Sequence, residues 1–298
     1  MKIIREIAEL RKYRAEQQSG GRTVGFVPTM GYLHDGHLSL VNRAKQETGC
    51  VIMSIFVNPL QFGPNEDFER YPRNEERDLD LARSAGVDAV FLPTVEEMYP
   101  SPIRTKVIVS DVTERLCGAS RPGHFDGVAT VVMKLFQMVQ PDKAFFGMKD
   151  AQQVAVISQM VNDLNLPVEV VPCPTLREQD GLAMSSRNVY LNEEERAQAV
   201  VLSRTLDQLE LWAREPGMTA ELLEGKMRSS IEAMPLARID YAEVLSFPAL
   251  QQIQGPIAAV SASQESLPAA QWIAALAVRF GSTRLIDNRI FQGGVRLV

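Results

Sequence analysis

The feature that most constrains the fold of this chain is the alternation of short apolar runs with amphipathic segments from residue 23 to about residue 174. The runs are rich in β-branched residues and short enough for buried strands, whereas the segments between them repeat apolar residues at the helical period. Strands that alternate with helices in this way form a parallel sheet covered by helices. The sequence therefore predicts a doubly wound α/β fold.

The predicted strands and helices alternate along this part of the chain. Strands are expected at residues 23–28, 50–58, 87–93, 104–110, 143–148 and 168–174. Helices are expected between them at residues 37–49, 74–86, 125–140 and 150–165. The first residues, 1–17, show the amphipathic pattern of a further helix.

The pattern changes near residue 176. Long charged helices are predicted at residues 193–215 and 219–234, followed by an alternating strand at 238–247. The Ala/Ser-rich segment 255–271 has no periodicity and is interpreted as a loop or excursion. At 298 residues the chain exceeds the usual size of one domain. We therefore expect a first domain at 1–175 and a smaller α+β domain at 176–298.

The composition excludes several classes of partner. The net charge is −6, and no block of Lys and Arg could neutralise the phosphates of a polynucleotide, so nucleic acid is not expected as a partner. No apolar window reaches the roughly 18 residues of a membrane span, and the N-terminus lacks the pattern of a signal peptide. Cys50, Cys117 and Cys173 include no C-x-x-C pair, so neither a disulfide framework nor a zinc site is indicated. We expect a cytoplasmic protein without membrane contact.

The chemistry is expected where polar residues follow the strands, because ligands of open α/β sheets bind beyond the carboxyl ends of the strands. PTMGYLHDGHLSL (28–40) places His34 and His37 at a helix entrance, and Gly31 and Gly36 let a ligand approach the backbone. Two imidazoles on one side of a helix can donate hydrogen bonds to a phosphoryl group. The alternative is that His34 caps the helix and His37 lies on its surface.

Polar residues also follow the second predicted strand. Asn58 and Gln61 carry neutral amides suited to a polar substrate, although Asn-Pro followed by Gly-Pro is also a common turn. Asp78, on the following helix, is either a support for a cation near phosphates or part of a solvated face.

The third histidine of the chain lies at another helix entrance. RPGHFDG (121–127) contains His124 and, in Arg121, a candidate anion contact. A single such histidine is most often structural. Because all three histidines fall beside predicted strand ends, the coincidence favours a site.

Further candidates follow the fifth strand and the domain junction. Lys149 lies at the start of a helix, where an ammonium group can reach phosphate oxygens, and is followed by Asp150, Gln152 and Gln153. The carboxylate of Asp150 also suits a helix N-cap. DGLAMSSRN (180–188) clusters two hydroxyls and a guanidinium in a predicted loop, which matches a triphosphate.

The combined set of side chains favours transfer at phosphorus. It contains imidazoles, an ammonium, a guanidinium, hydroxyls and amides, but no nucleophile paired with a base. Catalysis at phosphorus rests mostly on positioning and charge stabilisation. No G-x-x-x-x-G-K-[ST] motif occurs, and no G-x-G-x-x-G motif follows the first strand, so neither a P-loop nor a dinucleotide fingerprint is present.

These residues belong to sequence blocks that resemble the pantothenate synthetase (pantoate-beta-alanine ligase) family over nearly the full chain. PTMGYLHDGHLSL is similar to the family's version of the HIGH motif of the nucleotidylyltransferase superfamily. The other blocks occur in the family's order and spacing: FVNPLQFGPNEDFERYPR, RPGHFDGVATVV, FGMKDAQQ, DGLAMSSRNVYL and TRLIDNRIF. Several blocks together are more specific than one, so they favour the active-site interpretation of His34 and His37.

The resemblance implies a fold and a two-step ligation. The fold would be a Rossmann-like doubly wound parallel sheet with a smaller C-terminal α+β lid domain. ATP and (R)-pantoate would give pantoyl adenylate and pyrophosphate, and β-alanine would then attack the mixed anhydride to release AMP and pantothenate, the precursor of coenzyme A. Mg²⁺ is expected with the ATP, bound largely through phosphates and water. A homodimer is also expected.

The resemblance also implies the residues of the site. The expected catalytic residues are His37, in the family's proton-donor position, His34 and Lys149. The expected ATP-binding residues come from four segments: Met30, Gly31, Tyr32, Leu33, His34, Asp35, Gly36 and His37; Gly147, Met148, Lys149 and Asp150; Leu176; and Met184, Ser185, Ser186 and Arg187. Gln61 and Gln153 are expected to hold pantoate, with Gln61 also close to β-alanine and Asn58 nearby.

Two features depart from the family pattern. Met148 stands where the family commonly has Glu, a change without consequence if this position contributes mainly its backbone. Segment 255–271 is longer and less apolar than the corresponding strand of the relatives, which leaves the local fold of the second domain open.

Other functions compete with ligation. A plain nucleotidylyltransferase would show pyrophosphate exchange without AMP release that depends on β-alanine. A catalytically silent nucleotide-binding scaffold is disfavoured, because every residue type that triphosphate chemistry needs is present. An aminoacyl-tRNA synthetase is least expected, because the chain is acidic and lacks a basic tRNA-binding region.

Overall fold

The chain forms two compact units in the computed structural model, which describes residues 1–64, 66–257, 271–292 and 295–296. The first unit comprises Met1–Ser110, Arg121–Met148 and Val156–Cys173. The second unit comprises Asp111–Ser120, Lys149–Ala155 and the chain from Pro174 onward. Two segments that precede residue 175 therefore belong to the second unit. The lid role expected for residues 176–298 stays a prediction.

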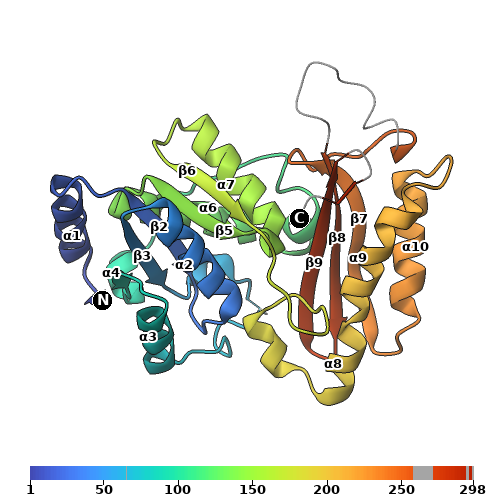
Figure 1. Ribbon diagram of the computed structural model, residues 1–298, viewed down its shortest axis with the longest axis horizontal. Helices are drawn as coiled ribbons and strands as arrows, with labels where there is room; N and C mark the ends of the chain where they lie inside the picture. The colour runs from blue at the N-terminus through green and yellow to red at the C-terminus, as the bar shows by residue number, and fades with distance from the viewer. Residues whose placement is uncertain (65, 258–270, 293–294, 297–298) are drawn as a thin grey trace. The chain divides into compact units, whose positions relative to one another are not determined.

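The first unit contains a six-stranded parallel sheet (Figure 1). Its strands are β1 (Lys2–Ile4), β2 (Val24–Thr29), β3 (Cys50–Ile55), β4 (Ala89–Phe91), β5 (Lys143–Gly147) and β6 (Glu169–Cys173). The order across the sheet is β1-β4-β3-β2-β5-β6. The chain thus winds outward through β3 and β4 on one side of β2 and through β5 and β6 on the other. The topological switch point, where ligands bind in such sheets, lies between β2 and β5.

Helices cover both faces of this sheet. They are α1 (Ile7–Ser19), α2 (Asp35–Glu47), η1 (Pro59–Gln61), α3 (Glu75–Ser84), α4 (Val95–Met98), α6 (His124–Val139) and α7 (Ala151–Asp163), of which α7 begins in the second unit. Val27 and Phe145 share one buried cluster with residues of α2 and α3. Their neighbours Phe26 and Phe146 pack edge-on against Phe136 of α6. Because alternate strand residues face opposite ways, the sheet is covered on both sides, and the predicted doubly wound α/β fold is confirmed.

Two predictions for the first unit were wrong. Residues 104–110 form no strand; the backbone N–H of Val107 donates instead to the hydroxyl of Thr130 on α6 (3.0 Å), and Ile108 is 67 % exposed. The helix expected from residue 1 begins only at Ile7, because Lys2–Ile4 form β1, in which Ile4 pairs with Phe91 of β4.

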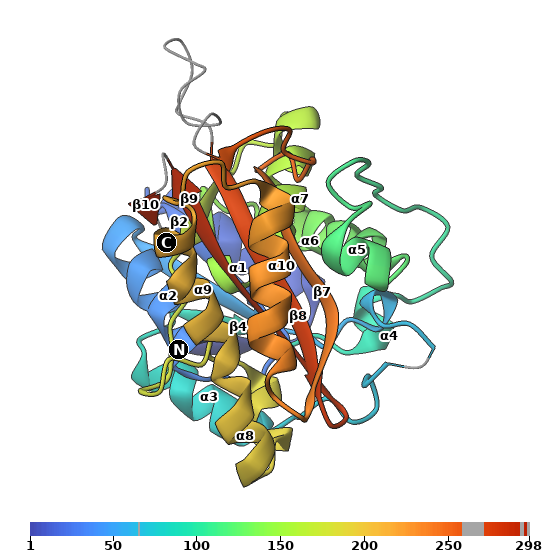
Figure 2. The same ribbon diagram turned by 90° about the vertical axis from the view of Figure 1, so that its right-hand side faces the viewer.

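The second unit contains a four-stranded antiparallel sheet (Figures 1 and 2). Its strands are β7 (Ala237–Phe247), β8 (Gln271–Phe280), β9 (Thr283–Gln292) and β10 (Val295–Arg296). Its helices are α5 (Leu116–Ser120), η2 (Met148–Asp150), η3 (Ser186–Tyr190), α8 (Glu193–Ala199), α9 (Val201–Trp212) and α10 (Ala220–Glu232), of which η2 begins at Met148 in the first unit. Both views show α9 and α10 beside each other against this sheet. Trp272 of β8 stacks on Phe291 of β9 in the core between the sheet and these helices, with ring centroids 4.1 Å apart.

Two further segments bear on the predictions for this unit. The single helix expected at 193–215 is divided at Val200 into α8 and α9, and the Val200 carbonyl accepts from the hydroxyl of Ser203 (3.1 Å). Most of the excursion expected at 255–271 lies outside the described residues, since 258–270 are not described.

Among the described residues, no helix combines the length and apolar character that crossing a membrane requires. Cys50, Cys117 and Cys173 are buried free thiols.

Candidate active site

Thr29, the last residue of β2, holds the turn that follows this strand. The Thr29 hydroxyl donates to the carbonyl of Ser54 on β3 (2.8 Å) and accepts from the backbone N–H of Gly31 (3.2 Å). Gly31 has a φ of +86°, and a Cβ at this position would lie 3.0 Å from both Asp78 Oδ2 and Ile55 Cγ2. A side chain at position 31 would therefore be strained by its backbone and by its surroundings.

Asp78 on α3 holds the backbone of the same turn. Its carboxylate accepts hydrogen bonds from the N–H groups of Tyr32 (2.6 Å) and Leu33 (2.7 Å). The side chain is only 2 % exposed, so the solvated face considered for Asp78 is wrong. Burial raises the pKa of Asp78, and the two N–H donors and Arg77 oppose this rise. Both oxygens are thus used to fix the path of the chain toward the histidines.

His34 and His37 lie at the first turn of α2. His34 is the N-cap residue, and the Nδ1 of His37 accepts a 3.3 Å hydrogen bond from the backbone N–H of His34. In neutral His37 this places the ring proton on Nε2, which is then the nitrogen that can donate. The two rings have centroids 4.0 Å apart and planes tilted by 34°. Capping and adjacent imidazoles, which the sequence presented as alternatives, therefore occur together.

Asn58 is used by the protein to hold Gln61. Its Nδ2 donates to Gln61 Oε1 (3.2 Å) and to the carbonyl of Gly127 (3.1 Å), and its Oδ1 accepts from the Tyr99 hydroxyl (2.8 Å) and the Leu60 N–H (3.3 Å). The residue is 1 % exposed. With four partners, the Asn58 amide fixes the orientation of Gln61.

The side-chain amide of Gln61 reaches the turn after β2. Its Nε2 donates to the sulfur of Met30 at 3.0 Å, while Asn58 occupies its Oε1. Sulfur is a weak acceptor, so a ligand oxygen that replaced it would gain a stronger bond. The first unit therefore brings Gln61 together with the segment that leads to His34.

The third histidine supports the backbone of Gln61. His124 Nδ1 is 2.8 Å from the Gln61 carbonyl oxygen, to which it donates, and Arg121 donates to His124 Nε2 (3.1 Å). Arg121 also forms two 2.6 Å bonds to the carboxylate of Glu66. The candidate anion contact of Arg121 is thus occupied by Glu66. Burial acts to raise the pKa of Glu66, but Arg121 holds it below its ordinary value.

The close approach of α6 to η1 depends on Gly127. A Cβ at this position would lie 2.2 Å from the carbonyl oxygen of Leu60 and 2.7 Å from the Cα of Gln61. Glycine therefore allows the contact that places the Gly127 carbonyl beside Asn58.

The residues after β5 divide between the units. The side chain of Met148 is 5 % exposed, so this position offers a ligand its backbone rather than its side chain. At Gly147 a Cβ would meet no atom within 4 Å. Lys149, in the second unit, lies with its Nζ 3.8 Å from Asp150 Oδ2, directly ahead of α7.

Two adjacent glutamines of α7 have different roles. Gln152 is 7 % exposed; its Nε2 donates to the carbonyls of Val112 (2.9 Å) and Arg115 (2.8 Å), and its Oε1 accepts from the N–H of Cys117 (3.0 Å). Among the described residues, the half-buried Gln153 has no side-chain hydrogen bond. Gln152 therefore holds the 111–120 segment, and the amide of Gln153 can bind a ligand.

The segment from Leu176 to Arg187 forms a tight loop in the second unit. The N–H of Met184 donates to the carbonyl of Leu176 (3.0 Å). Ser185 is the N-cap of η3, and its side chain accepts from the N–H of Arg187 (3.3 Å). Ser186 is buried. The two hydroxyls and the guanidinium predicted from the sequence are thus held by one short turn.

Sequence comparison decides the family. The model of the family described as "Pantoate-beta-alanine ligase" matches residues 2–290 of this chain. The chain belongs to the pantoate-beta-alanine ligase family. The pantothenate synthetase of Acetivibrio thermocellus is 52 % identical over 295 residues, which cover 98 % of this chain and 100 % of the relative. That of Carboxydothermus hydrogenoformans is 54 % identical over 296 residues, covering 98 % and 99 %.

Solved structures of this family have the same fold. The crystal structure of pantothenate synthetase from Thermus thermophilus has a TM-score of 0.85 and 47 % identity, covering 97 % of this chain and 98 % of that one. The pantoate-beta-alanine ligase of Francisella tularensis, complexed with beta-gamma ATP and beta-alanine, has a TM-score of 0.77 and 34 % identity, covering 98 % of both chains. The family expected from the sequence is confirmed, and with it the expected activity class of an ATP-using ligase.

The predicted site residues fall into one group in each unit. The first unit holds the 30–37 segment, Asn58, Gln61, Gly147 and Met148, and the second holds Lys149, Asp150, Gln153, Leu176 and the 184–187 segment.

The sequence did not reveal which residues position the others. Asp78 and His124 were noticed as candidates, but their bonds to backbone atoms of distant residues have no local signal.

Proposed function

We propose that this chain condenses (R)-pantoate with β-alanine at the expense of ATP, forming pantothenate, AMP and pyrophosphate through pantoyl adenylate. The observation that carries the proposal is the pair of adjacent imidazoles, His34 and His37, which directly follows β2 at the switch point of the sheet. The family match over residues 2–290 supports the choice of substrates.

The two steps need no nucleophile from the enzyme. A carboxylate oxygen of pantoate attacks the α-phosphorus, the bond from that phosphorus to the bridging oxygen breaks, and pyrophosphate leaves. The amine of β-alanine then attacks the acyl carbon, its C–O bond breaks, and AMP leaves with the oxygen that pantoate supplied. The amine loses its protons to solvent or phosphate. Alignment and stabilisation of charge on the phosphoryl oxygens are therefore the tasks of the protein.

The histidines suit the first step. The backbone N–H of His34 occupies Nδ1 of His37, so Nε2 carries the proton that a phosphoryl oxygen can accept. The adjacent His34 ring adds a second imidazole at the helix N-terminus, where backbone N–H groups and the helix dipole favour an anion. Asp78 contributes indirectly, because it holds the preceding turn in place.

The remaining assignments follow the chemistry of the side chains. Four residues of the second unit are proposed to bind the triphosphate, since an ammonium, a guanidinium and hydroxyls match phosphate oxygens. They are Lys149, Ser185, Ser186 and Arg187. Gln61 and Gln153 are proposed to bind pantoate. Asn58 is proposed as a positioning residue for Gln61, because its own amide is fully used.

Mg²⁺ is proposed to accompany ATP and to neutralise charge on the phosphates. The residues fit an ion held by phosphates and water: both Asp78 oxygens are used by backbone N–H groups, whereas Asp150 is a carboxylate with 45 % of its side chain exposed, beside Lys149. Among the described residues, no three His, Cys, Asp or Glu side chains lie together as a metal site, so no protein ligand is assigned to the ion.

Two broader expectations are retained as proposals. We propose a homodimer, which light scattering of the purified protein would detect as twice the chain mass. A cytoplasmic location is proposed because the three cysteines are free thiols, which a reducing compartment preserves.

An assay in which ATP, pantoate and β-alanine are each omitted in turn tests the function. AMP should accumulate only when all three are present. With ATP and pantoate alone, labelled pyrophosphate should exchange into ATP without net AMP release. Equal AMP formation without pantoate would show that the substrate is wrong. Exchange that β-alanine never converts into AMP release would identify a plain nucleotidylyltransferase.

Two substitutions test the assignment of the site. His37→Ala and Lys149→Ala should each lower kcat at least about 100-fold. Removing one hydrogen-bond donor that stabilises charge in the transition state typically lowers the rate by about this factor. Their unfolding temperatures should stay close to that of the unsubstituted protein. Unaltered turnover in both variants would contradict the site.

A further inference from the structure

A buried network of charged side chains surrounds β9 in the second unit. Asp287, 2 % exposed, accepts from the two terminal nitrogens of Arg177 at 2.7 and 2.8 Å. Arg289, also 2 % exposed, lies 3.5 Å from Asp287 and donates to Asp207 at 3.1 Å. Burial raises the pKa of Asp287, and Arg177 opposes this rise. A buried ion pair often stabilises a protein no more than apolar residues would. The backbone segments that this network holds in place therefore indicate its role.

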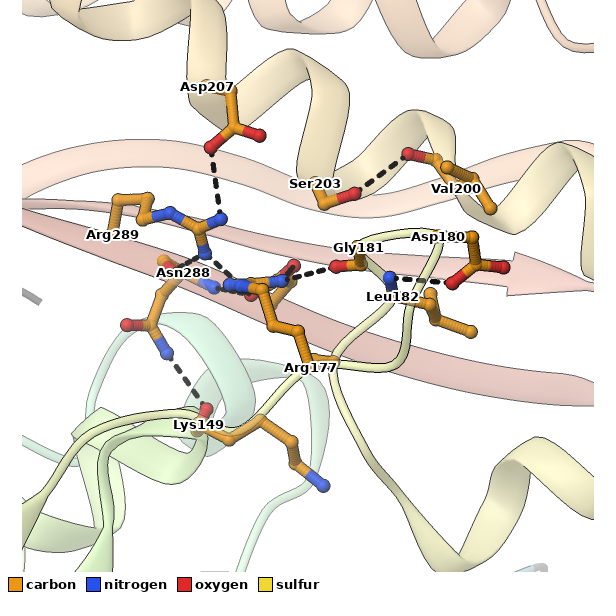
Figure 3. Close-up of polar contacts among 12 residues, drawn as sticks. Lys149, Arg177, Asp180, Gly181, Leu182, Val200, Ser203, Asp207, Asn288 and Arg289 are labelled. Carbon is orange, nitrogen blue, oxygen red and sulfur yellow. Dashed lines mark hydrogen bonds and ion pairs between the residues drawn. The ribbon is translucent and has the colours of Figure 1, made fainter. Parts of the chain in front are cut away.

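One end of the network holds the loop that precedes the proposed triphosphate ligands. Arg177 donates to the carbonyl of Gly181 at 2.9 Å, across the base of the loop (Figure 3). The loop is closed by the bond from the N–H of Glu178 to the carbonyl of Leu182 (2.8 Å) and by the bridge between Arg177 and Ala183. Residues 185–187 follow directly. Asp287, by orienting Arg177, therefore fixes the start of the segment that carries the two serines and Arg187.

The other end holds the backbone of Lys149. Asn288 Nδ2 donates to the carbonyl of Lys149 at 2.8 Å, and the backbone N–H of Asn288 donates to Asp287 Oδ1 at 2.8 Å. Figure 3 shows the side chain of Lys149 extending away from Asn288. Asn288 therefore contacts the backbone of Lys149 and not its ammonium group. The same carboxylate thus connects to Lys149 through Asn288 and to the 176–187 segment through Arg177.

We propose that Asp287 and Asn288 are positioning residues that set the placement of Lys149 relative to the 185–187 segment and thereby the affinity for the triphosphate of ATP. The inference rests on the proposed function, which assigns both groups to the triphosphate. Neither residue needs to touch ATP. A displacement of bound groups by about 1 Å can cost up to 100-fold in rate, so one hydrogen bond on the backbone of Lys149 is enough to matter.

Two substitutions of Asn288 test the proposal. Asn288→Ala removes the donor to the Lys149 carbonyl, and Asn288→Asp keeps the size but presents an acceptor to that carbonyl. Each should weaken binding of α,β-methylene-ATP about tenfold in calorimetry and raise the KM for ATP, while the affinity for AMP, which lacks the outer phosphates, changes less than about twofold. Asn288→Asp also provides the test if the alanine variant does not fold.

The matched control is Asp207→Asn. Asp207 lies at the far end of the same network, with 50 % of its side chain exposed, and accepts a hydrogen bond from Arg289. This variant should bind both nucleotides as the unsubstituted protein does. An equal loss in Asp207→Asn would show that general damage to the network, rather than the bond from Asn288, is responsible.

The outcomes separate this proposal from the proposed function. If the unsubstituted protein forms AMP and binds the analogue, and both Asn288 variants bind it equally well, the positioning role is wrong and the function stands. Equal losses for AMP and the analogue would also overturn it, because the triphosphate would not be the affected part. If the unsubstituted protein forms no AMP, the proposed function itself fails.

Discussion

The buried carboxylate of Asp78 accepts a 2.6 Å hydrogen bond from the backbone N–H of Tyr32, a residue whose φ of +49° lies in the left-handed region. Such a backbone conformation persists where its surroundings hold it. Asp78 supplies that restraint from α3, and the turn it holds leads directly into the N-cap His34. The placement of the two imidazoles thus depends on a residue that touches neither.

Asp78→Asn should therefore damage the site without altering a proposed ligand. The substitution puts an NH₂ group where a carboxylate oxygen accepts from a backbone N–H, so we expect a loss of about 1–3 kcal/mol in the free energy of unfolding. The kcat/KM for ATP should fall about 10- to 100-fold. Asp80→Asn is the control, since Asp80 lies on the same helix with 68 % of its side chain exposed. Unchanged kinetics in Asp78→Asn would refute the positioning role.

The adjacent residues Gln152 and Gln153 should give opposite results. Gln153→Ala is expected to raise the KM for pantoate at least about tenfold and to leave stability unchanged, because it loses a ligand contact and no internal bond. Gln152→Ala leaves three backbone groups without their partner, so it should lower the free energy of unfolding by roughly 2–5 kcal/mol. Chemical denaturation and pantoate kinetics of both variants measure this difference. Pantoate affinity that survives in Gln153→Ala would remove that residue from the site.

His124 should act on pantoate through the backbone of Gln61. His124→Phe removes the donor to the Gln61 carbonyl, and we expect the KM for pantoate to rise about fivefold to tenfold with little change in the KM for ATP. His124→Asn can place its Nδ2 near the position of the ring Nδ1 and should recover most of the loss. A rise that affects both substrates equally, or no recovery in the asparagine variant, would contradict this role.

The ion pair of Glu66 with Arg121 should make stability depend on pH in a defined direction. The folded-state pKa of Glu66 is held below its ordinary value, so its stabilising contribution is present above that ordinary value, about 4.3, and is lost as the pH falls through the folded-state pKa. At pH 7 the unsubstituted protein should exceed Glu66→Gln by about 1–2 kcal/mol in the free energy of unfolding. Urea unfolding between pH 7 and pH 3 should show this difference shrinking. A difference that grows on acidification would have the wrong sign.

The sequence predicted the elements whose pattern is local. The strands that begin near residues 24, 50, 143 and 169 are short apolar runs, and each was placed within about two residues of its observed start. The segments after these strands carry most of the predicted site residues, because strand ends of a parallel sheet are where ligands bind. Local patterning was therefore sufficient to place these strands, and the assignment of the site residues beyond them stays a prediction.

The errors arose where structure depends on a distant partner. Ile3, Ile4, Ile7 and Leu10 repeat at helical spacing, which concealed the short strand β1 that exists only through its pairing with β4. The β-branched run at 104–110 suits a strand, but its Val107 N–H bonds to a side chain on α6.

The positioning roles escaped prediction for the same reason. The bonds from Asp78 to Tyr32, Asn58 to Gly127 and His124 to Gln61 span 46, 69 and 63 residues, which no local pattern encodes.

The fate of the pantoate carboxylate oxygens tests adenylate formation most directly. Pantoate labelled with ¹⁸O in its carboxylate is incubated with ATP, β-alanine and the protein, and the AMP is analysed by mass spectrometry. Attack on the α-phosphorus followed by cleavage of the acyl C–O bond predicts that each AMP carries one labelled oxygen. Unlabelled AMP, or ADP in its place, would contradict the adenylate and with it the role given to His34 and His37.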